Sequence, residues 1–151
     1  MKTLEQIKNE MHEVTDRWFE EWHITGIKPT WDYEEVNKQI RRDYNHDLQV
    51  GDHAHVQHYT DIDPCTVIKR TKSMIVVRYD KATLSKDWKP QFDIGGFCAH
   101  CTNNDTQTYE FEEDADGNTE TFRWSEKFGQ WRNTSGEKVF PQWASFYDYN
   151  F

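Results

Sequence analysis

The hydrophobic pattern of this chain changes its period once, at Val50-Gly51-Asp52. Before this point apolar residues recur every three or four positions, as they do on one face of a helix. After it, short segments alternate apolar and polar residues or are rich in β-branched residues, which indicates strands. The sequence therefore predicts an α+β fold, with a helical N-terminal segment at residues 1–47 and a single antiparallel β-domain at residues 48–151.

The N-terminal segment is expected to hold two helices. Thr3 and Gln6 have the spacing of a capping box, which starts a helix, and Gly26 with Pro29 marks its end. The second helix should begin near Asp32. The apolar stripes of the two helices consist of Leu4, Ile7, Met11, Val14, Trp18 and Trp22, and of Tyr33, Val36, Ile40 and Tyr44. We expect both stripes to pack, either onto the β-domain or between subunits.

The β-domain is expected to be a small barrel or sandwich of about six or seven short antiparallel strands. Residues 70–73 are predicted to turn between two strands of one hairpin, and Asp116-Gly117 to close another hairpin. Residues 61–64 are predicted as a loop, and residues 81–96 as a long irregular loop that is ordered by its aromatic residues. The predicted strands are residues 53–59, 65–69, 74–79, 106–112 and 119–124.

The composition limits the classes of partner. Asp and Glu number 27 against 18 Lys and Arg, so the net charge of −9 repels phosphates and direct nucleic-acid binding is not expected. Aromatic residues make up 15% of the chain, which argues against disorder and for an aromatic core. Aliphatic residues are scarce, which favours a homo-oligomer. Three cysteines, with no apolar leader or membrane span, indicate a soluble cytoplasmic protein.

Several histidines and cysteines raise the question of a metal site. His53 and His55 would face the same side of one strand, and with Cys65 and Cys98-Ala99-His100-Cys101 they would supply zinc ligands. Structural zinc sites usually combine two ligand pairs at regular spacing, and a second such pair is missing. We therefore expect no metal and no cofactor. A thiolate activated by His100 is discounted, because the side chains of neighbouring strand residues diverge.

An enzymatic alternative comes from two H-x-T tripeptides, His58-Tyr59-Thr60 and His100-Cys101-Thr102. In two-histidine phosphoesterases such tripeptides lie on paired strands, and one histidine acts as base while the other acts as acid around a phosphodiester. A third copy begins at His23, inside the predicted first helix, so the tripeptide also arises by chance. A polar loop, rather than the apolar strand of such enzymes, follows each copy in the β-domain.

A ligand-binding interpretation accounts for more residues of the β-domain. Arginine and lysine at strand ends hold phosphates, arginine through two parallel hydrogen bonds. Amide side chains suit ribose hydroxyls or a base edge, and aromatic rings stack on bases. The candidates are Arg78, Phe92, Phe97, Asn103, Asn104, Gln107, Arg123, Trp124, Lys127, Trp131 and Arg132. The sequence has no glycine-rich phosphate motif, so a nucleotide would need a pocket of another kind.

Short motifs across residues 50–151 carry a resemblance to a known group of proteins. They are Val50-Gly51-Asp52, Thr66-Val67-Ile68, Thr71-Lys72-Ser73, Val77-Arg78-Tyr79-Asp80-Lys81-Ala82, Tyr109-Glu110-Phe111, Asp116-Gly117, Phe122-Arg123-Trp124 and Tyr147-Asp148-Tyr149. With these motifs the chain resembles small phage-encoded anti-defence proteins that include the first type of anti-Thoeris protein. Proteins of that type act as sponges that sequester the cyclic ADP-ribose signal made by bacterial TIR enzymes.

The resemblance implies an oligomeric, β-rich protein that binds the signal in pockets at subunit contacts and does not cleave it. The ligand contacts that it implies are an aromatic residue, an asparagine and arginines, by position Phe97 or Phe92, Asn104 or Asn103, Arg78 and Arg123. Lys127 stands where a further arginine is expected, and a lysine weakens a bidentate phosphate contact.

The sequence thus predicts a phage immune-evasion protein that is not an enzyme and that sequesters a cyclic ADP-ribose isomer in the host cytoplasm. Two alternatives stay open. One is a two-histidine phosphoesterase that degrades a cyclic nucleotide signal, and the other is an acidic inhibitor that binds a host defence protein directly. A membrane is not expected among its partners.

Overall fold

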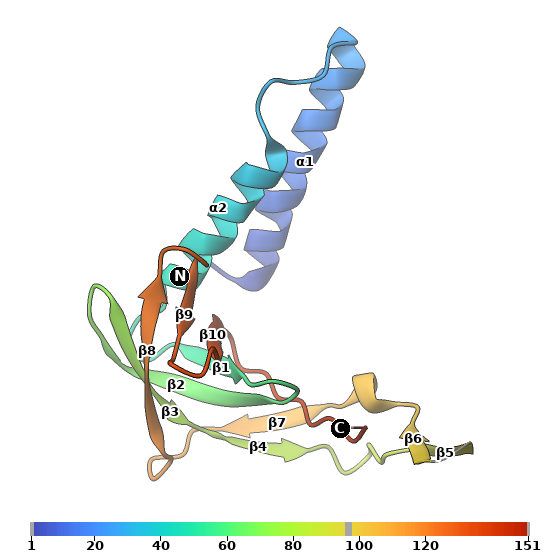
Figure 1. Cartoon of the computed structure of the whole chain (residues 1–151), viewed down its shortest axis with the longest axis vertical. Coiled ribbons are helices and arrows are strands. Elements are labelled where there is room, and N and C mark those ends of the chain that lie inside the picture. The colour runs from blue at the N-terminus through green and yellow to red at the C-terminus, as the bar shows by residue number, and fades with distance from the viewer. Residues whose placement is uncertain (1, 96–97, 151) are drawn as a thin grey trace. The chain divides into compact units, whose positions relative to one another are not determined.

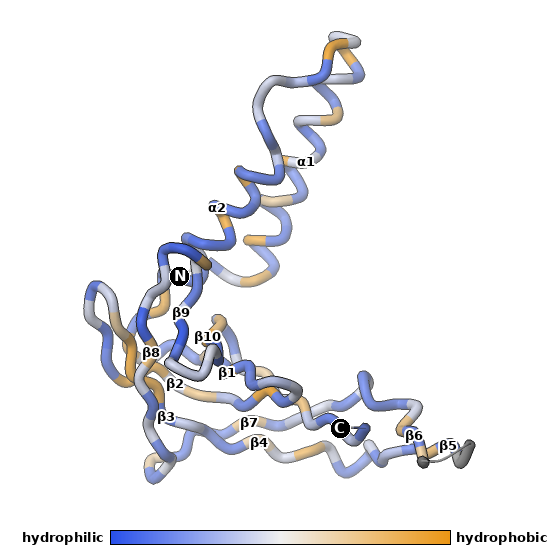
Figure 2. Tube along the Cα trace, viewed as in Figure 1, coloured by the Kyte–Doolittle hydropathy of each residue, from blue (hydrophilic) through white to orange (hydrophobic). Residues whose placement is uncertain are grey.

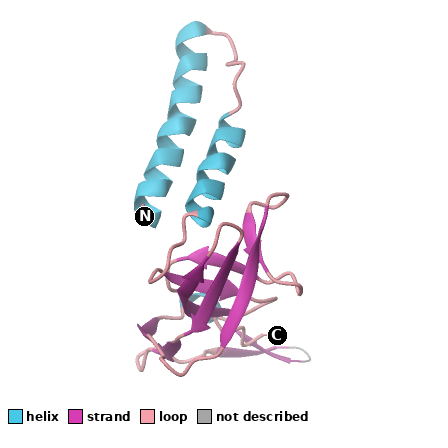
Figure 3. Ribbon diagram, turned by 90° about the vertical axis from the view of Figure 1, so that its left-hand side faces the viewer, coloured by secondary structure: helices cyan, strands magenta, loops and turns pink. Residues whose placement is uncertain are grey.

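The computed structural model describes residues 2–95 and 98–150 of the chain. It divides into two compact units, Met1–Leu48 and Gln49–Phe151. The predicted α+β class is confirmed, because two helices precede a closed antiparallel barrel of six strands and two small two-stranded ribbons (Figures 1 and 3). No helix in the described part of the chain has the length and apolar character needed to cross a membrane.

The first unit is a hairpin of two helices, α1 (Leu4–Thr25) and α2 (Tyr33–His46). The predicted capping box starts α1. The Thr3 hydroxyl accepts a hydrogen bond from the Gln6 N–H, and the Gln6 side chain accepts one from the Thr3 N–H. The Asp32 carboxylate caps the start of α2 in the predicted position.

The apolar stripes of the two helices pack against each other within this unit. Ile7, Val14 and Trp18 of α1 and Tyr44 of α2 are buried. The Trp18 indole N–H donates a hydrogen bond to the Trp31 carbonyl at 2.9 Å. A buried indole N–H without a partner costs about 1–3 kcal/mol, so this hydrogen bond fixes the loop between the helices against α1.

The barrel of the second unit contains six antiparallel strands in the circular order β1-β10-β9-β8-β3-β2. They are β1 (His53–Gln57), β2 (Ile62–Arg70), β3 (Met74–Tyr79), β8 (Thr119–Ser125), β9 (Gln130–Arg132) and β10 (Lys138–Pro141). Strands that follow each other in this set are neighbours, and the first and last strands pair to close the barrel. The elements β4 to β7 therefore form an insertion in a continuous meander.

Alternate side chains of the barrel strands point inward and form the core. Ala54 and Val56 of β1 and Ile75 and Val77 of β3 are fully buried, and Trp131 is the largest fully buried side chain. Hydrophobic residues accordingly lie along the barrel strands in Figure 2. Burial of each large apolar side chain contributes roughly 1.5–3 kcal/mol, so this core is the main source of the barrel's stability.

Two ribbons are inserted between β3 and β8 (Figure 1). β4 (Lys81–Leu84) pairs with β7 (Tyr109–Glu112), and β5 (Phe92–Gly95) pairs with β6 (Cys98–Cys101). A short 3-10 helix, η1 (Asn104–Thr106), connects the ribbons.

Two loop predictions were therefore wrong. Residues 81–96 contain β4 and β5, whose pairing partners lie further along the chain, so the segment itself shows no strand pattern. Residues 61–64 overlap the start of β2, which begins at Ile62 and continues through Pro64. There, Pro64 lies directly opposite His55, and its missing N–H does not prevent the pairing of β2 with β1.

The predicted hairpin at Asp116-Gly117 is also not formed. The strands on either side of it, β7 and β8, pair with β4 and β3 instead of with each other. The turn lies against the end of β3, where the Tyr79 N–H donates a hydrogen bond to the Asn118 carbonyl at 2.8 Å. A Cβ atom on Gly117 would lie 2.0 Å from the Tyr79 carbonyl oxygen, so this glycine is required by a close backbone approach.

The C-terminal segment, residues 142–150, packs across the outside of the barrel and the ribbons. The Trp143 ring stacks on His53 of β1 with ring centroids 3.4 Å apart, and Phe146 exchanges two backbone hydrogen bonds with Ile62, each of 3.0 Å. Further hydrogen bonds join the segment to β6 and η1. The prediction that the aromatic C-terminus is packed is therefore confirmed.

Substitution Gly117→Ala is expected to lower the free energy of unfolding by about 1–3 kcal/mol, because the added methyl group must push the turn away from β3. Urea denaturation monitored by tryptophan fluorescence measures this change. Asp116→Ala, at the exposed neighbouring position, is the matched control and should change stability by less than about 0.5 kcal/mol. Equal stability of the Gly117 variant and the wild type would show that the turn relaxes freely.

Candidate ligand-binding site

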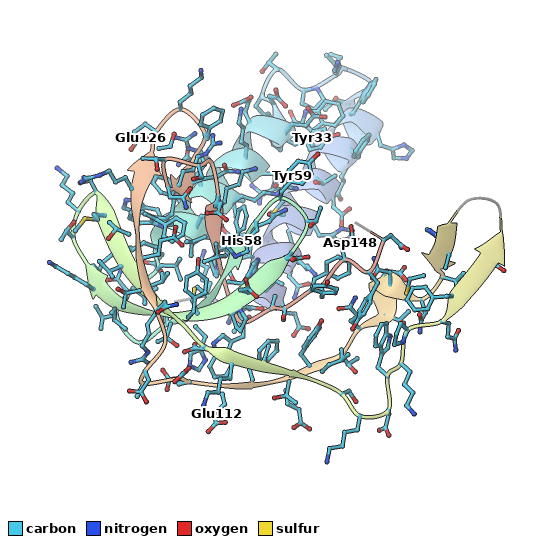
Figure 4. All side chains as sticks on the ribbon, turned by 60° about the horizontal axis from the view of Figure 1, so that its bottom comes forward. Tyr33, His58, Tyr59, Glu112, Glu126 and Asp148 are labelled. Carbon is cyan, nitrogen blue, oxygen red and sulfur yellow. The ribbon has the colours of Figure 1, made fainter. Side chains whose placement is uncertain are left out.

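The two candidate asparagines hold the connections around η1 in place. The Asn103 side chain accepts a hydrogen bond from the Gln91 N–H and donates one to the Lys89 carbonyl, both at 2.8 Å. The Asn104 side chain donates to an Asp148 carboxylate oxygen at 2.9 Å. Both amides thus form hydrogen bonds within the protein. Asp148, the partner of Asn104 in the C-terminal segment, is labelled in Figure 4.

The candidates Arg78 and Phe92 lie on different strands of the β-domain. Arg78 is on β3, where its half-buried guanidinium lies 3.7 Å from the Glu113 carboxylate. Phe92 is on β5, with 49% of its surface exposed. Phe97 lies outside the described residues. The remaining two candidates, Arg123 and Lys127, belong to β8 and to the turn that follows it.

Arg123 is brought together with a residue that was only a secondary candidate in the sequence. Arg123 on β8 lies directly opposite Arg132 on β9 in the antiparallel register. Their neighbours Trp124 and Trp131 also lie opposite each other, with ring centroids 5.1 Å apart, and Trp131 is fully buried. Because side chains alternate along a strand, the two arginines project from the outer face of the sheet.

A groove runs over this outer face, and we call it the arginine groove. It has a volume of about 900 Å³, and its lining includes Arg123, Arg132, Trp124 and Phe128. The Arg132 guanidinium lies over the Phe128 ring, 4.2 Å from the ring centroid, and 52% of the Phe128 surface is exposed. The β8–β9 turn that carries Phe128 is marked by Glu126 in Figure 4.

The electrostatics of the arginine groove favour an anion. Like charges directly opposite each other on neighbouring strands are destabilising. None of the described residues that line the groove is acidic. Three acids adjoin lining residues in the sequence: Glu126 accepts a hydrogen bond from the Trp124 indole at 3.0 Å, and Glu120 and Glu137 each accept one from the Asn133 amide at 2.8 Å. A bound phosphate would therefore relieve the repulsion between Arg123 and Arg132, through the hydrogen bonds that arginine forms best with such groups.

A second groove, which we call the His58 groove, lies on the other side of the β9–β10 turn. It has a volume of about 520 Å³ and is lined by Gln57, His58, Tyr59, Ser135, Gly136, Glu137 and Lys138. His58 and Tyr59 follow each other in the loop between β1 and β2 (Figure 4). The Tyr59 side chain is 90% exposed at the edge of this groove.

His58 is held between two carboxylates. Its Nδ1 contacts a Glu137 carboxylate oxygen, and its Nε2 lies 2.9 Å from an Asp63 carboxylate oxygen. Asp63 belongs to β2, while Glu137 directly precedes β10. The imidazole thus joins both neighbours of β1 at the open end of the barrel.

The hydrogen bonds continue from Glu137 across the barrel end. The Asn133 amide donates to both Glu137 and Glu120, each at 2.8 Å, and the Tyr79 hydroxyl donates to the other Glu120 oxygen. The Asn133 side-chain oxygen also accepts the Glu137 N–H at 2.9 Å, which shapes the β9–β10 turn. Every carboxylate in this network has a donor, as partly buried charges require.

Two pKa values show how this network is charged. Burial lowers the pKa of His58, but hydrogen bonding to Glu137 and the charges of Glu137 and Asp63 outweigh burial and raise it above the ordinary 6.5. The hydrogen bond from His58, followed by that from Asn133, lowers the pKa of Glu137 below the ordinary 4.5. Both shifts favour the charged pair, an imidazolium beside a carboxylate.

The other sequence motifs do not gather into one site. His53 stacks on Trp143, and His55 Nδ1 lies 2.7 Å from the Gln142 carbonyl. Cys101 is buried in β6. Across the described residues no three His, Cys, Asp or Glu side chains are arranged to hold a metal ion.

The two H-x-T tripeptides lie in separate parts of the β-domain. His58 follows β1, whose neighbours are β2 and β10, whereas His100 is an exposed residue of β6, which pairs with β5. The strands that carry the two tripeptides are thus not paired with each other, unlike those of the two-histidine phosphoesterases.

Sequence reasoning missed the acidic partners of His58. Glu137 is 79 positions away from His58 in the chain, so no local pattern connects them. One signal was present: Glu120 alternates with Phe122 and Trp124 on β8, which places a carboxylate at an inward-facing position. A charge at such a position needs polar partners, and this points to a network at the barrel end.

Comparisons with protein families, with curated proteins and with solved structures find no match to this chain.

Substitution His58→Gln is expected to destabilise the β-domain most at mildly acidic pH. Because the pKa of His58 is raised in the folded state, its contribution is fully present below the unfolded pKa of about 6.5 and is lost as pH rises through the folded pKa. The stability difference between wild type and variant should therefore shrink as the pH rises above about 6.5.

Urea denaturation of both proteins across this range measures the difference, and the general repulsion of an acidic chain cancels because both proteins share it. A difference that stays constant with pH would mean that His58 contributes through packing and not through its charge. His12→Gln, on the exposed surface of α1, is the matched control, and its stability difference should be small throughout.

Proposed function

We propose that this protein binds a phosphate-bearing nucleotide of the cyclic ADP-ribose class in the arginine groove and holds it without chemical change. The observation that carries the proposal is the cross-strand pair of Arg123 and Arg132 beside an exposed aromatic ring. Two guanidinium groups supply the phosphate contacts, and a base stacks on the Phe128 ring in place of the Lys127 ammonium, which lies 5.3 Å from the ring centroid. Such stacking is worth on the order of 1–3 kcal/mol per base.

The local charge of the groove contrasts with that of the whole chain. The chain carries a net charge of −9, which keeps long polyanions away, whereas the groove presents two arginines and no carboxylate among its described lining residues. This combination favours a small anionic ligand over a nucleic acid.

The lining of the arginine groove supports binding rather than cleavage. Its described residues include serine, threonine and asparagine side chains but no histidine, cysteine or carboxylate that would act as a general base. Removal of a signal by stoichiometric binding needs no such group. This function agrees with the resemblance to phage anti-defence sponges, and the proposed place of action is the host cytoplasm.

Calorimetric titration with a panel of cyclic ADP-ribose isomers, with ADP-ribose as the linear reference, tests the proposal. We expect binding of at least one isomer and recovery of that isomer with unchanged mass after the protein is heat-denatured. A linear product would establish an enzyme instead. No heat with any nucleotide would contradict the proposal and favour direct inhibition of a host protein.

Substitution Arg123→Ala is expected to weaken nucleotide binding at least about tenfold, because a charge-assisted phosphate contact is lost. The same change should leave the unliganded protein as stable as wild type or more stable by about 0.2–1 kcal/mol, since it removes a like-charge pair. Calorimetry and urea denaturation measure the two effects.

Arg123→Lys keeps the charge but loses the paired hydrogen bonds, and its affinity should lie between wild type and Arg123→Ala. Lys86→Ala, which removes one exposed charge between β4 and β5, is the control for net charge. If Lys86→Ala and Arg123→Ala weaken nucleotide binding equally, the loss would be due to the change in net charge and not to a direct contact of Arg123.

A further inference from the structure

The arginine groove and the His58 groove meet at the β9–β10 turn. Gly136 of this turn lines both grooves. It has a φ angle of +81°, and a Cβ atom there would lie 3.2 Å from Nη2 of Arg132. Because the two grooves share Gly136, which carries no side chain, they adjoin at this residue beside the Arg132 guanidinium, and an extended ligand that crosses the turn would reach into both.

The two grooves favour different parts of a ligand. Arg123 and Arg132 favour a phosphate on one side of the turn. On the other side, the Glu137 and Asp63 carboxylates offset the positive charges of His58 and Lys138, so that groove offers no surplus positive charge to a second phosphate. The His58 groove therefore suits a part of the ligand that is polar but uncharged.

We infer that the His58 groove binds a ribose unit of the nucleotide whose phosphates lie in the arginine groove. The inference rests on the proposed function and adds to it a subsite and a specificity. A carboxylate accepts hydrogen bonds from ribose hydroxyls in other nucleotide sites, and Glu137 is placed to do so. Each of its oxygens accepts one hydrogen bond, from His58 or Asn133, and retains a further lone pair.

The remaining lining residues fit a sugar. The Gln57 amide provides both a donor and an acceptor, and the Lys138 ammonium and Ser135 hydroxyl add donors. Tyr59 offers an exposed ring at the edge of the groove, on which an apolar face of the sugar packs.

The test compares ADP with ADP-ribose on the full-length chain by calorimetry. ADP lacks the terminal ribose, so ADP-ribose should bind about tenfold more tightly. In the double variant Tyr59→Ala and Gln57→Ala this advantage should disappear, while the affinity for ADP stays unchanged. These positions leave the hydrogen bonds of His58 intact, and thermal unfolding of the variant checks that it is folded.

The outcomes separate the inference from the proposed function. Equal affinity of the wild type for ADP and ADP-ribose overturns the ribose subsite and leaves nucleotide binding in place. If the double variant loses affinity for ADP and for ADP-ribose equally, the subsite is also overturned, because these residues then do not contact the terminal ribose specifically. If the wild type binds a cyclic isomer but neither ADP nor ADP-ribose, the ribose subsite fails and the proposed function stands; if no nucleotide of either kind binds, both proposals fail. Gln91→Ala, an exposed amide on the strand-flanking loop before β5, is the matched control and should retain the preference for ADP-ribose.

Discussion

The pairing of β1 with β10 is the constraint on which the β-domain depends. It joins the first and last strands of the barrel in an antiparallel register, from Ala54 opposite Pro141 to Gln57 opposite Lys138. Closure removes the two open edges that a flat six-stranded sheet would expose. It also brings His58, just after β1, to Glu137, just before β10, and so fixes the turn that separates the two grooves.

Buried and half-buried polar groups at the end of the barrel link stability to the candidate site. Asn133 lines the arginine groove and at the same time holds Glu120 and Glu137. Polar networks of this kind are effective only when every member has a partner, because an unpaired group in a low-dielectric setting is costly. The arginine pair departs from this pattern, since its like charges oppose each other across β8 and β9. A fold that tolerates such a pair beside a satisfied network is consistent with a ligand that completes the charge balance.

The fold class was predictable because it depends on local patterns. The change of hydrophobic period, the Thr3 and Gln6 capping box and the hairpin of β2 and β3 can all be identified over a few residues. Pairings between distant segments could not be predicted from such local patterns. The insertion of β4 to β7 was therefore predicted as a loop followed by a hairpin. For the site, the arginines of β8 and β9 are close in sequence and were identified, whereas His58 and its partner Glu137 are 79 positions apart. Asn103 and Asn104 have suitable chemistry for a ligand, but their hydrogen bonds are used within the protein.

Closure between the first and last strands also determines how the chain must reach this structure. The hairpins of β2 with β3 and of β8 with β9 require only short loops to close, whereas His55 and Gln142 are 87 positions apart when they meet. The entropy lost on closing a loop grows with its length, and folding slows as contacts become less local. The barrel is therefore expected to assemble from its hairpins and to seal along β1 and β10 last. On that pathway the two grooves come into existence together, in the final step of folding.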